Sequence, residues 1–310
     1  MTAPATPPII SLSENALTLD IAPTIGGSIA AFYSRREGRI HHWLRPASPE
    51  ALRDGEAEGM ASFPLLPFCN RIRDGRFTFE GRQVALPSNR AGSPHTIHGY
   101  GWQQAWTVLE QGADFARLGL DYPGDVWPYP FRATQTFTLR EGRLTVEIEI
   151  ENRGAAPMPF GLGHHPYLPH RPGTTLSTRV ESMWGGDAEV MPTGLEQPAL
   201  LARLRDGVLL AEVVQDNNFI GWEHAARVDW PATGDLAQAS SLTLRADAPL
   251  DYFVLYSPEA ADHFCIEPVS NCTDWLNLGG YPQSQVGGAV LAPGASTQVR
   301  FTLTPEWAPR

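Results

Sequence analysis

The chain has 310 residues, enough for one large domain or two of medium size, and 42% of them are hydrophobic, an ordinary share for a globular protein. Its net charge of −11 argues against a nucleic-acid partner, because a phosphate backbone requires a basic surface. Glycine and proline, at 29 and 28 positions, favour many short strands joined by turns over long helices. A neutral ligand is the partner that accords best with this charge.

The N-terminal residues lack the basic and apolar regions of a signal peptide. No stretch approaches the roughly 18 consecutive apolar residues of a membrane-spanning helix. Cys69, Cys265 and Cys272 are an odd number without C-x-x-C spacing, which favours reduced thiols over disulfides or a cysteine zinc site. We therefore predict a cytoplasmic protein with no membrane partner, whereas the sequence does not indicate an oligomeric state.

Alternation of apolar and polar residues with period two predicts strands along the whole chain. The predicted strands are residues 17–21, 77–79, 84–86, 134–139, 144–150, 241–245, 252–256, 264–266 and 298–303. The clearest hairpin joins the fourth and fifth of these around Glu141-Gly142-Arg143. Residues 200–214 show some helical periodicity but could equally form a strand and a loop. With no repeat or linker in view, we predict a single domain over residues 1–310, all-β, built as a large antiparallel β-sandwich.

Four short segments gather unusual polar residues in turn-rich or aromatic surroundings. They are residues 70–72, 95–102, 163–168 and 264–268. Each has an ordinary explanation by itself: a histidine after a glycine-rich turn is usually a hydrogen-bonded loop residue, and a glutamate before proline often marks the end of a strand. His41-His42 and His263 lack such surroundings, and we expect them to be structural.

In their order, these segments resemble the aldose 1-epimerase (galactose mutarotase) family. The motifs are Asn70-Arg71-Ile72 followed by Gly75, Ile97-His98-Gly99 before Trp102, His165-Pro166-Tyr167-Leu168, and Glu267-Pro268. The similarity extends from about Gly26-Gly27 to the C-terminal strand. It implies a galactose mutarotase-like supersandwich and an isomerase that interconverts the α and β anomers of a free aldose, with a small sugar as substrate and with no cofactor and no metal.

The resemblance also implies a role for each matched residue. His165 would be the general acid and Glu267 the general base, with His98 as an electrostatic partner that positions the substrate. Arg71 and Asp216 would bond to sugar hydroxyls. Further substrate contacts are expected from Asn70, Trp102 and Tyr167.

Anomer exchange requires the C1 hydroxyl to lose a proton while the ring oxygen gains one, and a carboxylate with an imidazolium supplies both transfers. We expect Glu267 and His165 to face each other across a gap as wide as a pyranose ring instead of bonding directly. We also expect each group to favour the charged form of the other. Leu168 departs from the aromatic residue common at its position in the family, and we expect it near the sugar.

Three alternatives stay open. A hexose-6-phosphate 1-epimerase would keep the fold and could cradle its phosphate between Arg71, Arg73 and Arg76. A non-catalytic carbohydrate-binding or sensor protein would lack the acid or the base. A zinc hydrolase would need His164-His165, yet adjacent histidines on a strand point to opposite faces, and no H-x-x-x-H spacing occurs in the chain.

Overall fold

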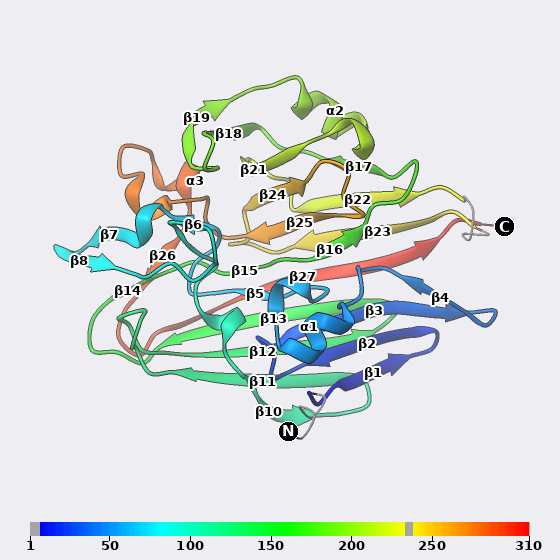
Figure 1. The fold of residues 1–310 in the computed structure, drawn as a ribbon, viewed down its shortest axis with the longest axis horizontal. Coiled ribbons are helices and arrows are strands. Elements are labelled where there is room, and N and C mark those ends of the chain that lie inside the picture. Colours follow the sequence, from blue (N-terminus) through cyan, green and yellow to red (C-terminus); the bar gives the residue numbers. More distant parts are fainter. Residues whose placement is uncertain (1–6, 233–237, 310) are drawn as a thin grey trace.

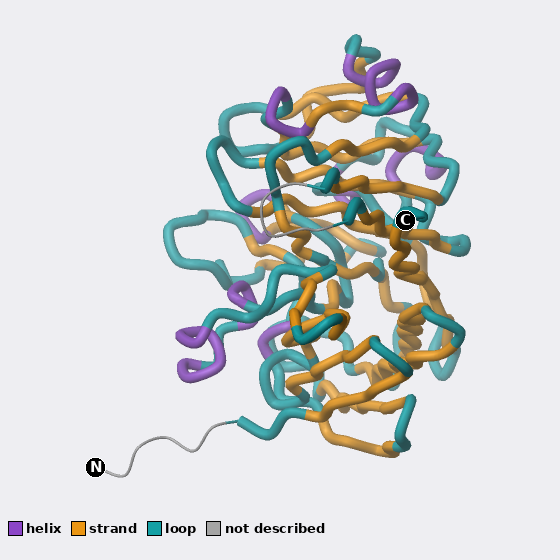
Figure 2. The backbone as a smooth tube through the Cα atoms, turned by 90° about the vertical axis from the view of Figure 1, so that its right-hand side faces the viewer, coloured by secondary structure: helices purple, strands orange, loops and turns teal. Residues whose placement is uncertain are grey.

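The computed structural model describes residues 7–232 and 238–309. Strands make up about half of this part of the chain, and short helical segments lie in the connections between them (Figures 1 and 2). None of the helices described is long and apolar enough to cross a membrane. The fold is an all-β antiparallel sandwich, as predicted, with two large sheets and several small ones.

The larger sheet has nine strands in the order β10-β11-β12-β13-β27-β23-β22-β17-β20. Their bounds are Thr107–Gln111 (β10), Phe115–Tyr122 (β11), Phe131–Arg140 (β12), Arg143–Asn152 (β13), Ser296–Trp307 (β27), Ser240–Ala246 (β23), Ala225–Trp230 (β22), Thr175–Thr178 (β17) and Val208–Leu209 (β20). The predicted hairpin is β12–β13, and the C-terminal strand β27 lies between β13 and β23 (Figure 1). Along β13, every second residue from Leu144 to Ile150 is fully buried, which confirms the predicted alternation.

The second sheet has eight strands, in the order β19-β18-β21-β24-β25-β15-β5, with β16 also paired to β25. Their bounds are Pro192–Glu196 (β19), Ser182–Gly186 (β18), Gln215–Ile220 (β21), Tyr252–Ser257 (β24), His263–Val269 (β25), Gly163–His164 (β15), Pro64–Leu65 (β5) and Tyr167–Pro169 (β16). Successive residues of β25 point to opposite faces. Phe264 and Ile266 therefore enter the main core, and Cys265 and Glu267 face the other way.

The remaining strands form small sheets around these two. They are β1 (Ile10–Glu14), β2 (Leu17–Ala22), β3 (Ser28–Arg36) and β4 (Arg39–His42) in one sheet, and the pairs β6 (Arg71–Ile72) with β9 (Thr96–Ile97), β7 (Arg76–Phe79) with β8 (Arg82–Ala85), and β14 (Met158–Phe160) with β26 (Ala289–Leu291). The helical segments are α1 (Pro49–Asp54), α2 (Leu200–Asp206), α3 (Gln283–Val286), η1 (Ala57–Gly59), η2 (Arg73–Gly75), η3 (Gly101–Gln103), η4 (Leu210–Glu212) and η5 (Trp275–Asn277). Residues 200–214 thus contain a helix, a short strand and a turn, so each alternative was partly right.

The main core lies between the two large sheets. It joins Phe219 and Phe253 from the eight-stranded sheet to Leu244 and Phe301 from the nine-stranded sheet. The ring of His164 on β15 lies 5.3 Å from that of Phe301 on β27, so the two sheets are in contact next to His165, which directly follows β15. Burial of these large side chains supplies most of the stabilising free energy of such a fold.

We expect Phe301→Ala to lower the free energy of unfolding by about 3–5 kcal/mol, because it removes a buried ring and leaves a cavity between the sheets. Urea denaturation followed by tryptophan fluorescence measures the change. Val290→Ala is the matched control: Val290 is 50% exposed, so its loss should cost no more than about 0.5 kcal/mol. Equal effects of the two substitutions would contradict this packing.

Candidate active site

The outer face of the eight-stranded sheet carries a row of side chains that crosses four strands. Asp216 on β21 pairs with Tyr256 on β24, Tyr256 pairs with Cys265 on β25, and Cys265 pairs with Tyr167 on β16. Cross-strand partners share a face, so these four side chains lie on the same side of the sheet. Glu267, two residues beyond Cys265, projects to that side as well. The alternation of the strands thus builds the floor of a site from residues far apart in the chain.

Two strained turns form a wall beside this floor. Asn70 and His98 have φ values of 58° and 62°, a left-handed backbone that residues other than glycine rarely adopt. The turns hold each other: the His98 N–H donates to the Asn70 carbonyl at 2.9 Å, and the Asn70 N–H donates to Nδ1 of His98 at 3.2 Å. At Gly99, with φ 65°, a Cβ would lie 2.1 Å from the Leu66 carbonyl oxygen, so only glycine fits there. Strain kept at adjacent positions is typical of functional sites.

Floor and wall enclose a cavity of about 270 Å³. It brings together seven of the eight predicted site residues, which span positions 70 to 267. These are Asn70, Arg71, His98, His165, Tyr167, Asp216 and Glu267. The cavity is also lined by residues that the sequence did not single out as site residues, namely Arg45, Glu58, Phe63, Arg90, Ile97, Tyr256 and His263.

Three expectations about individual residues need correction. Trp102, expected to contact the sugar, is 6% exposed and packs against Phe63, with 5.5 Å between ring centroids; it lines a neighbouring cavity instead. Leu168, expected near the sugar, is fully buried in the main core because it follows the cavity-facing Tyr167 on β16. His263, expected to be structural, lines the cavity.

His165 and Glu267 are in direct contact. Nε2 of His165 lies 3.3 Å from Oε1 of Glu267, so the expected gap as wide as a sugar ring does not exist between them. Both side chains are almost fully buried. A ligand in the cavity must therefore approach the two groups from one side and meet them together.

Burial decides the charge of this pair. The rings of Phe63 and Tyr167 stack on either side of the His165 imidazole, with 4.8 and 4.6 Å between centroids, and desolvation lowers the pKa of His165 to about 3. Desolvation also raises the pKa of Glu267 well above its usual value; Asp216 adds to this rise and Arg71 opposes it. Both groups were expected to be charged, but desolvation is the largest cause of both pKa shifts, and each shift favours the neutral form.

The neutral pair holds one exchangeable proton. A protonated carboxyl beside a neutral imidazole contains as many protons as a carboxylate beside an imidazolium. Transfer of one proton across the 3.3 Å contact would interconvert the two arrangements, so we expect the pair to titrate as a unit. The pair can therefore accept a proton at one atom while it donates a proton at the other.

His98 is fixed in one tautomer by its neighbour. Its Nδ1 accepts the Asn70 N–H, so the ring proton lies on Nε2, which is left as a donor for a ligand. Burial lowers the pKa of His98 well below its usual value, with further contributions from His165 and Arg71. The imidazoles of His98 and His165 meet edge to face, with 5.2 Å between their centroids.

Arg71 and Asp216 lie together at another part of the cavity. Nη2 of Arg71 is 3.4 Å from Oδ2 of Asp216, and Nη1 donates to Oδ1 of Asn70 at 3.1 Å. Burial raises the pKa of Asp216, which Arg71 opposes. These three residues place donors and acceptors of fixed orientation side by side, an arrangement suited to adjacent hydroxyl groups.

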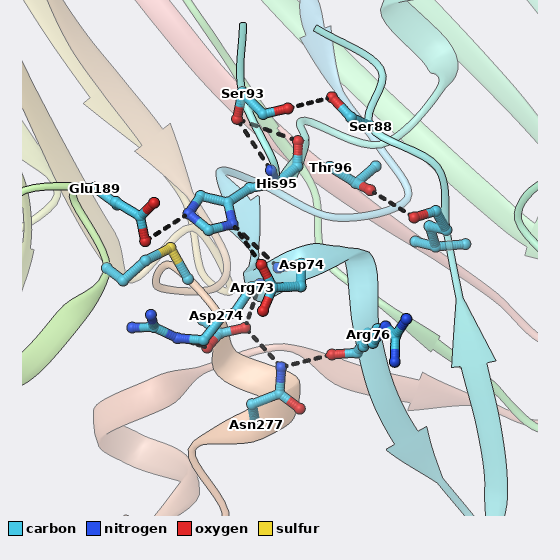
Figure 3. A network of polar contacts seen from close by, with 12 residues as sticks. Arg73, Asp74, Arg76, Ser88, Ser93, His95, Thr96, Glu189, Asp274 and Asn277 are labelled. Atoms are coloured by element: carbon cyan, nitrogen blue, oxygen red, sulfur yellow. Dashed lines mark hydrogen bonds and ion pairs between the residues drawn. The ribbon is translucent and has the colours of Figure 1, made fainter.

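Figure 3 shows a second polar network, which includes Asp274 and Arg73 and is joined to the wall at Arg71. The Asp274 N–H donates to the Arg71 carbonyl at 2.8 Å, and Oδ1 of Asp274 accepts the Arg73 N–H at 2.9 Å. Buried His95 accepts the Asp74 N–H on Nδ1 at 3.0 Å. Arg73 thus belongs to this network and not to the cavity. Arg76 does not line the cavity either, so the phosphate cradle of three neighbouring arginines is not formed.

Asn271 links the strand of Glu267 to the turn that carries Arg71. Its side chain is fully buried; Oδ1 accepts the Cys69 N–H at 3.1 Å, and Nδ2 donates to the Cys69 carbonyl at 3.1 Å. Cys69 directly precedes Asn70, and Asn271 lies four residues after Glu267. The strand that carries Glu267 and the turn that carries Arg71 are therefore joined by buried hydrogen bonds.

The described residues offer no group of three or more His, Cys, Asp and Glu side chains that could hold a metal ion. His164 and His165 point to opposite faces, as the alternation predicted: His164 packs against Phe301, and His165 lines the cavity. The adjacent histidines therefore cannot act as a ligand pair.

Some of the cavity residues missed by the sequence analysis carried a usable signal. Tyr256 lies on a predicted strand, and alternation along that strand places it on the same face as Val254, the cross-strand partner of Glu267. Arg45, Glu58 and Arg90 lie outside the strands, where no spacing rule connects them to the site. Only the folded chain brings them to the cavity.

The sequence of this chain is similar to those of known proteins. The family model for aldose 1-epimerase matches residues 8–304. The chain is 32% identical to the uncharacterized protein YphB of Escherichia coli K12, over 96% of this chain and 99% of that protein. The chain belongs to the aldose 1-epimerase family. The resemblance found in the sequence motifs is thereby confirmed.

Two further relatives place this aldose 1-epimerase family member among proteins of the same fold. A crystal structure of an E. coli K12 protein provisionally assigned as an aldose 1-epimerase matches it with a TM-score of 0.84 and 28% identity, over 97% of this chain and 99% of that one. Galactose mutarotase of Rattus norvegicus is 29% identical over 174 residues, which are 50% of this chain and 48% of the rat protein.

We expect His98 to stay neutral and protonated on Nε2 from about pH 5 to about pH 8, because burial lowers its pKa and Asn70 occupies Nδ1. Long-range ¹H–¹⁵N spectra of protein labelled at histidine report the tautomer, with the signal assigned by its loss in His98→Asn. The control is the urea-unfolded chain, in which the histidines should titrate near about 6.5. A folded His98 that titrates there would contradict the described wall.

Proposed function

We propose that this family member is a mutarotase: it interconverts the α and β anomers of a free aldose by acid–base ring opening and closure. The observation that carries the proposal is the contact between His165 and Glu267 inside a cavity lined with hydroxyl-binding groups. The similarity to rat galactose mutarotase supports it. The substrate is a small sugar, and the predicted cytoplasmic location, which stays a prediction, suits such a substrate.

The direct contact suits the chemistry better than the expected gap would. The hydroxyl oxygen to be deprotonated and the ring oxygen to be protonated are both bonded to C1, so they are close together. In ring opening, Glu267 as carboxylate accepts the proton of the C1 hydroxyl, and His165 as imidazolium donates a proton to the ring oxygen. The bond between C1 and the ring oxygen breaks, and C1 becomes the aldehyde carbon.

Ring opening leaves Glu267 protonated and His165 neutral, the arrangement that burial favours. Rotation about the C1–C2 bond presents the other face of the aldehyde. The two proton transfers then run in reverse and restore the original arrangement, so no cofactor is consumed. Arg71, Asp216 and Asn70 would hold the other hydroxyls, and Nε2–H of His98 would orient the oxygens near C1.

We expect Glu267→Gln and His165→Asn each to lower kcat by roughly 10²–10⁴-fold, the usual effect of losing a general acid or base. Both substitutions are close in size to the native residue, so the circular dichroism spectrum should not change. Anomer exchange is measured by NMR or polarimetry on glucose, galactose, xylose, arabinose and glucose 6-phosphate. His224→Asn and Glu259→Gln, outside the cavity, are the matched controls. Turnover near the wild-type value in either site variant would exclude the proposed mechanism.

The pH profile should differ from that of an ordinary histidine enzyme. The active pair holds one proton, and it gains a second only below a pKa of about 3 for His165, whereas it loses the first only above the raised pKa of Glu267. We therefore expect kcat/KM to stay level from about pH 5 to about pH 7 and to fall on the alkaline side. The uncatalysed rate is subtracted at each pH. An acid limb near about pH 6.5, the usual pKa of histidine, would show that His165 is not desolvated.

A further inference from the structure

Three arginines line the cavity, and two of them are neutralised there. Arg71 is paired with Asp216 at 3.4 Å, and Arg90 is paired with Glu58 at 3.0 Å. Each of these ion pairs has no net charge. The third arginine, Arg45, is bound differently.

Arg45 has no carboxylate partner. Its Nη2 donates to the carbonyl oxygens of Glu58 and Met60 at 3.2 and 2.9 Å, and its guanidinium stacks 4.0 Å above the centroid of the Tyr167 ring. Among the residues that the structure describes, no carboxylate oxygen lies within 4.0 Å of it. Asp262, on the turn before β25, is 89% exposed and bonds to His263 instead.

The remaining groups do not cancel this charge. His165 and Glu267 together are neutral in either arrangement of their shared proton, since one is the sum of two neutral groups and the other of opposite charges. The contents of the cavity therefore leave one positive charge, on Arg45, next to the ring stacked on His165. Inside a partly buried cavity such a charge attracts an anion more strongly than it would in water.

We propose that the substrate is an acidic aldose whose anionic substituent, a carboxylate or a phosphate, binds to Arg45. The proposal rests on the proposed mutarotase function and names its substrate class. A guanidinium bonds such groups through its remaining N–H donors with charge assistance. The overall charge of −11 does not oppose this, because charges on the outer surface are screened beyond about 8 Å at physiological ionic strength.

The first arm of the test compares matched sugars. Anomer exchange is measured for glucose, glucuronate and glucose 6-phosphate, so the two acidic sugars distinguish a carboxylate from a phosphate. We expect one of them to exceed glucose in kcat/KM by about 10- to 100-fold, the range of one hydrogen bond to a charged group. Its KM should rise with salt, whereas that of glucose should not.

The second arm uses Arg45→Gln and Arg45→Lys. Because Arg45 also stacks on Tyr167, the decisive readout is the ratio of kcat/KM for the acidic sugar to that for glucose within each variant; a merely structural defect would lower both values and leave the ratio unchanged. We expect Arg45→Gln to abolish the preference and Arg45→Lys to keep part of it. Arg205→Gln, which removes the same charge from the exposed helix α2, should retain the wild-type ratio.

A wild-type enzyme that prefers glucose, or a preference that survives in Arg45→Gln, would overturn the proposal. If no sugar were turned over, the proposed function would fail, and binding would then decide the question separately. Saturation-transfer NMR with glucuronate, glucose 6-phosphate and glucose should show an acidic sugar bound by wild type and lost in Arg45→Gln. Equal binding of all three, or of none, would refute the role of Arg45.

Discussion

The exclusion of water from His165 and Glu267 is the constraint on which the rest of the site depends. In water, an imidazole and a carboxyl in contact would favour the charged form of each other. Here the stacked rings of Phe63 and Tyr167 and the sheet beneath them exclude the water that would stabilise those charges. The pair is therefore neutral and holds a proton that can move in either direction. The proposed reaction both removes and returns a proton at neighbouring oxygens, and such a pair can perform both transfers and be restored after each turnover.

Two kinds of local structure produce that environment. The floor relies on regular pairing: because Asp216, Tyr256, Cys265 and Tyr167 are cross-strand partners, their common face is fixed by the register of four strands. The wall relies on irregular backbone. The left-handed turns at residues 70 and 98 orient their side chains in directions that an extended strand does not allow. Regular structure supplies rigidity, and the strained turns supply direction.

The sequence was sufficient for the parts of the structure that depend on short periods and motifs. Alternation located the β12–β13 hairpin, and the family motifs named seven residues that line one cavity in the fold. It could not give the contact between His165 and Glu267, since that distance depends on how β15, β16 and β25 meet. It misjudged their protonation because part of the burial comes from Phe63, a residue outside the four motifs. The position of Trp102 was predicted wrongly because a motif gives only the order of residues along the chain. It does not show that the ring of Phe63, and not that of Trp102, lines the cavity.

The hydrogen bonds of Asn271 separate the site into a bonded unit, which contains the Glu267 strand and the Arg71 turn, and the loops that surround this unit. The Glu267 strand and the Arg71 turn share these buried hydrogen bonds, so a substitution in one of them disturbs the position of the other. Three other cavity residues lie outside the strands and outside that bonded unit, namely Arg45, Glu58 and Arg90. Substitutions in these loops can therefore change the charge of the cavity without breaking the hydrogen bonds that join the Glu267 strand to the Arg71 turn.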